Sequence, residues 1–278
     1  MSLREINEAW ESSSFYDEKI VERTFGRYKE YISATFFIDI EYDTSSKGYY
    51  ISNLDFKTNN ALYKYLLSAF HVQQLARLAM KHKNRVSLME APSGVEHLHT
   101  ILKAIDEGHI IEYQYHSYTQ YTTTTRRRVP CFLKTWEQRW YLVAESLTSQ
   151  TLAVYALERM SHIRILPEKG KPSKQLTLES YFEGSYGIDH EDYPAEFIKI
   201  KIYGHQVEYV RAKPIHESQQ EIETCEEWSV FSYLLKPCYN FYQNLLWHRE
   251  LLEVLEPEGV RGKMREIVSG MFCKYRRI

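Results

Sequence analysis

The sequence predicts a multidomain protein of the α+β class. Two stretches with helical spacing precede a short strand hairpin near the N-terminus. Five short strand patterns follow a single helix in the middle of the chain, and residues 197–278 alternate strands with helices. A length of 278 residues is enough for two or three domains, each with its own hydrophobic core.

The composition favours a soluble globular protein, with 44% hydrophobic and 26% charged residues. No apolar run is long enough to cross a bilayer, and the N-terminus lacks the pattern of a secretion signal, so we expect a cytoplasmic protein with no membrane partner. The net charge of −2 provides no global attraction to nucleic acid, so any such contact must come from local patches.

Residues 1–54 have the element order of a DNA-binding domain. Ser2–Glu5 has the form of a capping box that begins a helix. A second helix is predicted over 21–36, and strand patterns at 38–42 and 49–52 form a hairpin. This order resembles the latter part of a winged helix-turn-helix, with 21–36 as the recognition helix and the hairpin as the wing. Because one more helix normally precedes these elements, we predict a partial winged helix-turn-helix.

Four residues of this region are candidates for contact with a double-stranded DNA operator. Arg23, Thr24 and Arg27 lie at the start of the predicted recognition helix, off its apolar stripe, and Lys47 lies at the tip of the wing. Residues 1–54 hold six Lys or Arg against ten Asp or Glu, a poor balance for a surface that faces phosphates. Ordinary solvated helix charges therefore remain an open alternative.

Residues 55–94 are predicted to form a linker helix, with helical spacing over 59–81, that supports a homodimer or packs on the next domain. A helix from His97 to Glu107, ended by Gly108, begins the domain at 95–168. Five short strands follow it, which favours a small, strongly curved β-barrel. They are predicted at 109–116, 128–134, 139–145, 153–157 and 162–166.

Alternation predicts the faces of two of these strands. In the first strand, Ile111, Tyr113 and Tyr115 face one way, and we assign Tyr113 to the core. In the third strand, one face could fill a core while the other, with Tyr141 and Val143, meets a ligand.

The C-terminal part begins with a hinge. Lys169–Lys174 is rich in Gly, Pro and Lys, and we assign residues 169–196 to the hinge. Residues 197–278 then run strand, helix, two strands, helix, strand and helix. This order indicates an open sheet with helices on one side, a C-terminal α/β sandwich of ferredoxin-like order.

Two motifs carry a family resemblance. Trp140–Leu142 and Tyr155–Met160 look like the two signature pieces of the WYL-domain family of bacterial transcription regulators, with Glu158 where the family usually has Asp and Met160 where it has Ile. The resemblance implies an SH3-like or Sm-like β-barrel for residues 95–168 and a WCX-type C-terminal extension for residues 197–278. The layout is similar to that of WYL regulators from Bacteroides-like bacteria.

The resemblance also places arginines on one face of the barrel, where a planar guanidinium matches phosphate oxygens two at a time and tyrosine rings stack on bases. The predicted ligand-binding residues are Tyr115, His116, Arg126, Arg128, Arg139, Tyr141 and Arg159. Either Arg126 or Arg128 matches the basic strand of the family.

For each arginine the alternative is a surface ion pair, such as Arg159 with Glu158 or Arg139 with Glu137. Catalysis has little support, because the chain contains no GxSxG, GxxxxGK[ST] or GxGxxG motif. The widely spaced cysteines and histidines match no metal-ligand pattern, so we expect no catalytic residue, cofactor or metal.

Two hypotheses follow. The first is a ligand-responsive, homodimeric DNA-binding transcriptional regulator whose WYL barrel binds an effector, either a nucleotide or a short single-stranded nucleic acid. The second is a nucleic-acid or nucleotide sensing module that regulates a partner protein without binding a promoter itself. The acid-rich N-terminal region favours the second.

Overall fold

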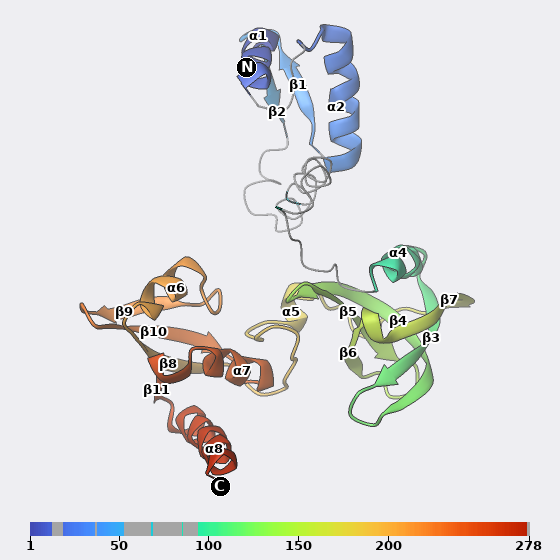
Figure 1. The fold of residues 1–278 in the computed structure, drawn as a ribbon. Coiled ribbons are helices and arrows are strands. Elements are labelled where there is room, and N and C mark those ends of the chain that lie inside the picture. The colour runs from blue at the N-terminus through green and yellow to red at the C-terminus, as the bar shows by residue number, and fades with distance from the viewer. Residues whose placement is uncertain (13–18, 37, 53–67, 69–84, 86–93, 277–278) are drawn as a thin grey trace. The chain divides into compact units, whose positions relative to one another are not determined.

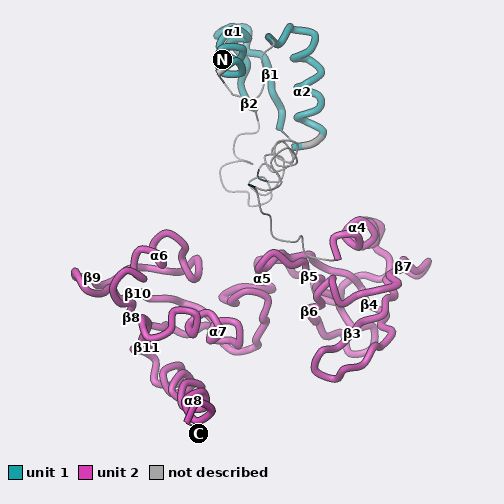
Figure 2. Tube along the Cα trace, viewed as in Figure 1, with its two compact units in different colours: residues 1–89 teal, residues 90–278 magenta. Residues whose placement is uncertain are grey.

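The computed structural model describes residues 1–12, 19–36, 38–52, 68, 85 and 94–276 (Figure 1). The chain divides into two compact units, residues 1–89 and 90–278 (Figure 2). The linker predicted at 55–94, with its helix at 59–81, lies outside the described residues apart from Ser68, Arg85 and Gly94. None of the helices in the described ranges is long and apolar enough to cross a membrane.

The first unit has the predicted helix, helix, hairpin order. Its elements are α1 (Leu3–Ser12), α2 (Glu22–Phe36), β1 (Ile40–Asp43) and β2 (Gly48–Ile51). The capping box is confirmed, since the Glu5 amide donates to Ser2 Oγ at 3.3 Å and the Ser2 amide donates to Glu5 Oε2 at 2.7 Å. Phe25 of α2 is buried, and its ring centroid lies 4.7 Å from that of Tyr49 in β2. The hairpin is therefore packed against the second helix.

The second unit begins with a five-stranded antiparallel sheet in the order β6-β5-β4-β3-β7. Its elements are η2 (Val95–His97), α4 (Leu98–Glu107), β3 (His109–Ser117), β4 (Thr122–Trp136), β5 (Arg139–Ser146), β6 (Leu152–Ala156), η3 (Leu157–Arg159) and β7 (Met160–Lys169). The predicted helix end at Gly108 is confirmed, with Gly108 at φ 65°.

The sheet is open, whereas the sequence predicts a small, strongly curved β-barrel. No ladder joins β6 to β7 in the part of the chain that the structure describes. The short strand β6 leads directly into η3, so the chain leaves this edge of the sheet before it can pair with β7. Because the three residues of η3 reach at most about 10 Å, the end of β6 and the start of β7 still lie close together at this corner.

Buried side chains lie on both faces of this sheet. Ile111, Tyr113 and Tyr115 are buried on the face that also packs against α4, as the alternation of β3 predicts. On β5, Leu142 joins the same core, but Val143 packs on the opposite face and is also fully buried. The prediction that this second face of β5 meets a ligand is therefore wrong at Val143. The reason is that the chain after β7 folds back over it.

The C-terminal part of the second unit is a four-stranded antiparallel sheet in the order β11-β8-β10-β9. Its elements are α5 (Leu178–Tyr181), β8 (Glu196–Tyr203), α6 (Gln206–Ala212), β9 (Gln220–Thr224), β10 (Trp228–Leu235), α7 (Tyr239–Trp247), η4 (Arg249–Leu251), β11 (Leu252–Glu256) and α8 (Glu258–Tyr275). Ile198, Ile200 and Ile202 alternate along β8 and are fully buried in one core with side chains of α6 and α7. The predicted element order and the open sheet with helices on one face are both observed.

The end of β4 contacts the segment before β8. Lys134 Nζ donates to the carbonyl oxygen of Gly187 at 2.6 Å and lies 3.7 Å from the centroid of the Phe182 ring. Two residues further on, the Trp136 ring packs against Gly187 and against Tyr186, with 5.2 Å between the two ring centroids. Burial lowers the pKa of Lys134 to about 8.

We expect wild-type stability, relative to a Lys134→Met variant, to rise with pH from about 8 to 10.5. In this window the folded protein loses the Lys134 proton while the unfolded chain keeps it, so the unfolded state binds more protons. The gain should be about 1 kcal/mol, less than the pKa shift alone implies, because the half-exposed amine is screened by water. Urea denaturation of both proteins below and above this window measures the difference. A difference that stays constant with pH would contradict the assigned burial of Lys134.

Candidate ligand-binding site

Three tyrosine rings lie together on the inner face of the five-stranded sheet, the face that packs against α4. Tyr113 and Tyr115 alternate on β3, and Tyr155 of β6 reaches the same face. The ring centroids of Tyr115 and Tyr155 are 5.1 Å apart, those of Tyr113 and Tyr155 are 5.7 Å apart, and both pairs are nearly perpendicular. Edge-to-face packing of this kind stabilises aromatic clusters.

Two arginines of β4 lie beside these rings. Cross-strand partners share a face of a sheet, and Arg126 is paired with Tyr113. The guanidinium carbon of Arg126 lies 5.7 Å from the centroids of both Tyr115 and Tyr155. Arg128 Nε donates to the Tyr155 hydroxyl at 3.0 Å. Both guanidinium groups are therefore within the range of cation–π attraction to a tyrosine.

A third arginine comes from η3. The guanidinium carbon of Arg159 lies 4.8 Å from the Tyr115 centroid and 4.2 Å from the Tyr118 centroid. Arg159 Nε also donates to the carbonyl oxygen of His116 at 3.0 Å, which fixes the direction of the side chain. We refer to Arg126, Arg128, Arg159, Tyr115 and Tyr155 as the arginine–tyrosine cluster.

The three arginines of the cluster carry uncompensated charge. None of them forms an ion pair with a carboxylate among the residues that the structure describes, whereas Arg127, on the other face of β4, pairs with Glu168 at 2.5 Å. The Nε atom of Arg126 is buried and has no hydrogen-bond partner within these residues. A buried donor without a partner is costly, so an acceptor from outside the chain would stabilise it.

A cavity lies at the arginine end of the cluster. Its volume is about 570 Å³, in the range of about 300–1,000 Å³ that is usual for small-molecule sites. It is lined by Thr124, Thr125, Arg126, Arg127, Arg128, Leu147 and Thr148. Six of these seven residues carry a hydroxyl or guanidinium donor, which suits an anionic ligand.

Most of the predicted ligand-binding residues lie in or beside the cluster. Both Arg126 and Arg128 belong to it, although the sequence left open which of them matches the family. Tyr115 is buried, and burial raises the pKa of its hydroxyl while nearby Arg159 opposes the shift. His116 is exposed; its Nδ1 lies 3.2 Å from Thr123 Oγ1 and its carbonyl oxygen holds Arg159.

Arg139 and Tyr141 are placed differently. Arg139 forms an ion pair with Glu158 at 3.1 Å, and among the described residues its guanidinium lies over none of the cluster's rings. The predicted alternatives were ion pairs of Arg139 with Glu137 and of Arg159 with Glu158. In the structure Glu158 pairs with Arg139 instead of Arg159. Tyr141 is buried, and burial together with the Glu158 charge raises its pKa.

The four DNA-contact candidates lie on α2 and in the turn between β1 and β2. Arg23 and Arg27 are exposed on α2, and Thr24 between them is half-buried. Lys47 is exposed in the turn between β1 and β2, with φ 51°. Three of the four residues are thus exposed.

Tyr155 and Tyr118 were not among the predicted site residues. Tyr155 was used only as the first residue of a signature motif, although alternation along 153–157 would have placed it on the core face. Tyr118 lies in the turn after β3, where no periodic pattern reveals its direction. Within the described ranges, no three His, Cys, Asp or Glu side chains are grouped so that they could hold a metal ion.

The fold and the cluster define a small antiparallel β-domain with a cationic, aromatic inner face. Residues 96–165 match the family model of the WYL domain, so the chain contains a WYL domain and the predicted resemblance is confirmed.

The solved structures that are similar to the chain include the following two. One is Proteasome accessory factor B/C (PafBC) of Arthrobacter aurescens, with 17% identity, a TM-score of 0.36 and coverage of 92% of this chain. The other is a CRISPR Cas-related protein, with 14% identity, a TM-score of 0.44 and coverage of 98% of this chain and 78% of that one. The chain spans only 42% of the PafBC chain. No curated protein matches the sequence.

Proposed function

We propose that the protein is a ligand-responsive transcription regulator whose WYL domain binds a nucleotide or a short single-stranded nucleic acid. The observation that carries this proposal is the arginine–tyrosine cluster, in which three arginines lie on tyrosine rings and none is neutralised by a carboxylate of the described residues. Phosphate oxygens would pair with the guanidinium groups, and a base would stack on an aromatic or guanidinium plane.

The first unit is the proposed DNA-binding part, a partial winged helix-turn-helix. In support, α2 presents Arg23 and Arg27 to solvent and the hairpin presents Lys47 at its tip. We also assign the five-stranded sheet to the SH3-like or Sm-like class and residues 197–278 to a WCX-type extension of ferredoxin-like order. The strand orders β6-β5-β4-β3-β7 and β11-β8-β10-β9 support these assignments.

Regulation would follow from differential binding. An effector that binds one arrangement of the second unit more tightly shifts the protein toward that arrangement. In a homodimer, two first units would contact two operator half-sites, so a change in their spacing would change operator affinity.

A second candidate function is a sensor that acts on a partner protein instead of a promoter. Residues 1–54 contain ten Asp or Glu and only six Lys or Arg. This acidic balance favours the partner-protein function, because phosphates repel an acidic surface.

A mobility-shift titration separates the two functions. With the duplex that lies upstream of the gene, we expect a salt-dependent shift, and the double variant Arg23→Ala/Arg27→Ala should weaken it by about tenfold. Arg4→Ala is the matched control, since Arg4 is engaged by Glu8 at 3.0 Å on α1. If the duplex is not shifted while an oligonucleotide still binds the protein, the partner-protein function is favoured.

A further inference from the structure

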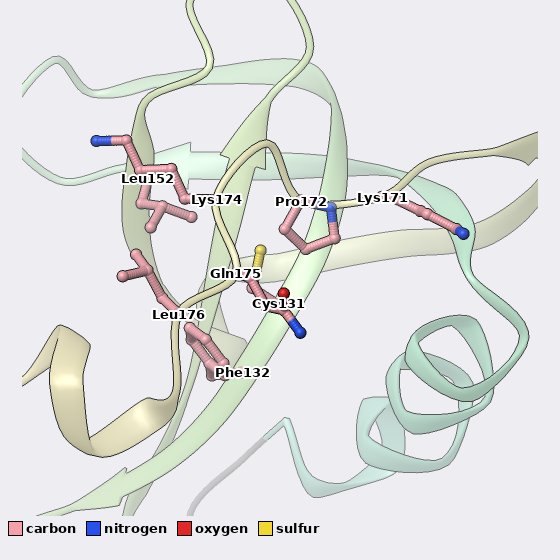
Figure 3. Close-up of a pocket in the computed structure, with 8 residues that line it drawn as sticks. All are labelled: Cys131, Phe132, Leu152, Lys171, Pro172, Lys174, Gln175 and Leu176. Atoms are coloured by element: carbon pink, nitrogen blue, oxygen red, sulfur yellow. The ribbon is translucent and has the colours of Figure 1, made fainter.

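A second cavity lies on the outer face of the five-stranded sheet, opposite the arginine–tyrosine cluster. Residues 170–182, which we call the strap, cross this face, and Tyr181 and Phe182 pack there against Val143 of β5. Between the strap and strands β4 and β6 a cavity of about 460 Å³ remains (Figure 3). It is lined by Cys131, Phe132, Leu152, Lys171, Pro172, Lys174, Gln175 and Leu176.

The walls of this cavity are mainly apolar. Phe132 of β4 and Leu152 of β6 form the sheet side, and Pro172 and Leu176 form the strap side. Burial raises the pKa of the Cys131 thiol to about 11, and its Sγ donates to the Val129 carbonyl oxygen at 3.4 Å. At neutral pH the thiol therefore stays almost entirely protonated and reacts only slowly as a nucleophile.

Two lysines of the strap provide positive charge. Neither Lys171 nor Lys174 forms an ion pair or a side-chain hydrogen bond with any residue that the structure describes. The buried carboxylate of Glu145 is already engaged, since it accepts from the Ser173 amide at 2.9 Å and from the Ser173 hydroxyl at 2.7 Å. In Figure 3 the two lysines extend to opposite sides of the strap. A ligand with one anionic group would therefore pair with one of them.

The strap is held in place by hydrogen bonds at two points. The Gly170 amide donates to the Gly108 carbonyl oxygen at 3.0 Å, and Ser173 is fixed by Glu145. The strap also approaches the sheet closely, because a Cβ at Gly170 would lie 2.8 Å from Ile110 and 2.9 Å from Val129. A cavity with fixed walls costs little ordering entropy when a ligand binds.

We propose that this cavity binds a small amphipathic anion, an aromatic ring or short acyl chain with a single carboxylate or phosphate group. The apolar part would lie against Phe132, Leu152 and Leu176, and the anionic group would pair with Lys171 or Lys174. The volume suits a small-molecule ligand, and the apolar walls disfavour a polynucleotide backbone. This site is separate from the one in the proposed function, because the two lie on opposite faces of the sheet.

Calorimetric titration of the full-length protein tests the proposal. The probes are 1-naphthyl phosphate and 1-naphthoate, with 1-naphthol and inorganic phosphate as the separated halves. We expect at least one of the two anions to bind about tenfold more tightly than either half, because apolar contact and ion pairing then act together. Leu152→Trp should fill the cavity and weaken this binding by about tenfold or more. Leu102→Trp, at an exposed position of α4, is the matched control.

The lysines are tested separately. Lys171→Gln or Lys174→Gln should weaken anion binding by about threefold to tenfold, whichever lysine forms the pair, while Lys213→Gln should change nothing. If neither lysine variant weakens the binding, the assignment of the anionic group is wrong.

Protection of Cys131 locates the bound probe without relying on a core variant. In a Cys225→Ser/Cys273→Ser background, the two exposed thiols are absent and Cys238 is buried, so slow alkylation by iodoacetamide reports on Cys131. The bound anion should slow this alkylation, and should still do so after Arg159→Ala, which alters only the other face. If neither anion binds at millimolar concentration, or if binding leaves Cys131 unprotected, the proposal is overturned.

Discussion

Replacing Arg159 with alanine should weaken the binding of a short single-stranded oligonucleotide by about 10- to 100-fold. A hydrogen bond to a charged group contributes about 1.5–3 kcal/mol, and 1.4 kcal/mol corresponds to tenfold in affinity. The Arg159 guanidinium is half-buried, lies on the Tyr115 ring and has no carboxylate partner in the described residues, so its charge is available to a phosphate. Fluorescence anisotropy of a labelled oligonucleotide at two salt concentrations measures the effect.

Arg139→Ala provides the matched control for this experiment. Arg159 is next to Glu158 in the sequence, but the residue that forms an ion pair with Glu158 is Arg139. Its removal should change the oligonucleotide affinity less than threefold, because its charge is already paired with Glu158 and its guanidinium lies over none of the cluster's rings among the described residues. Equal losses in the two variants, or none with Arg159→Ala, would contradict the cluster as the binding site.

This contrast shows what the sequence could not resolve. Strand alternation was sufficient to place Tyr115 on the inner face and His116 on the outer one, because a period of two needs only local information. The separation of Arg139 from Arg159 depends on which of them meets the single carboxylate of Glu158. That choice is set by the path of η3, a tertiary feature that no spacing along the chain encodes.

Some features of the fold were likewise predictable from the sequence, and others were not. The order of the C-terminal elements was predictable from residues 197–278, since Ile198, Ile200 and Ile202 mark one strand and α6 and α7 each bury two apolar residues at helical spacing. The open edge between β6 and β7, and the burial of Val143 under the strap, were not predictable. The burial of Val143 depends on how a segment rich in Gly, Pro and Lys folds back, and such a segment has no periodic apolar pattern to reveal its packing. The open edge depends on the path of η3, which follows β6 directly.

Gly94→Ala should lower the free energy of unfolding by about 3 kcal/mol, because it combines backbone strain with overpacking. Gly94 has φ 94°, a conformation that L side chains rarely adopt. An added Cβ would also lie 2.7 Å from the Glu158 amide nitrogen and 2.7 Å from the Leu157 carbonyl carbon. Backbone atoms cannot move aside as a flexible side chain can, so η2 and η3 must separate. Urea denaturation of the full chain measures the loss.

The variant Gly108→Ala separates the effect of backbone strain from the effect of overpacking. Gly108 also has a positive φ, 65°, but a Cβ there would meet nothing within 4 Å, so only the strain of about 1–2 kcal/mol should remain. The difference between the variants therefore measures the contact of Gly94 with the turn that carries Arg159. Because that contact positions η3, Gly94→Ala should also weaken oligonucleotide binding in the absence of urea, whereas Gly108→Ala should not. Equal destabilisation by both substitutions would mean that the turn is not held by Gly94.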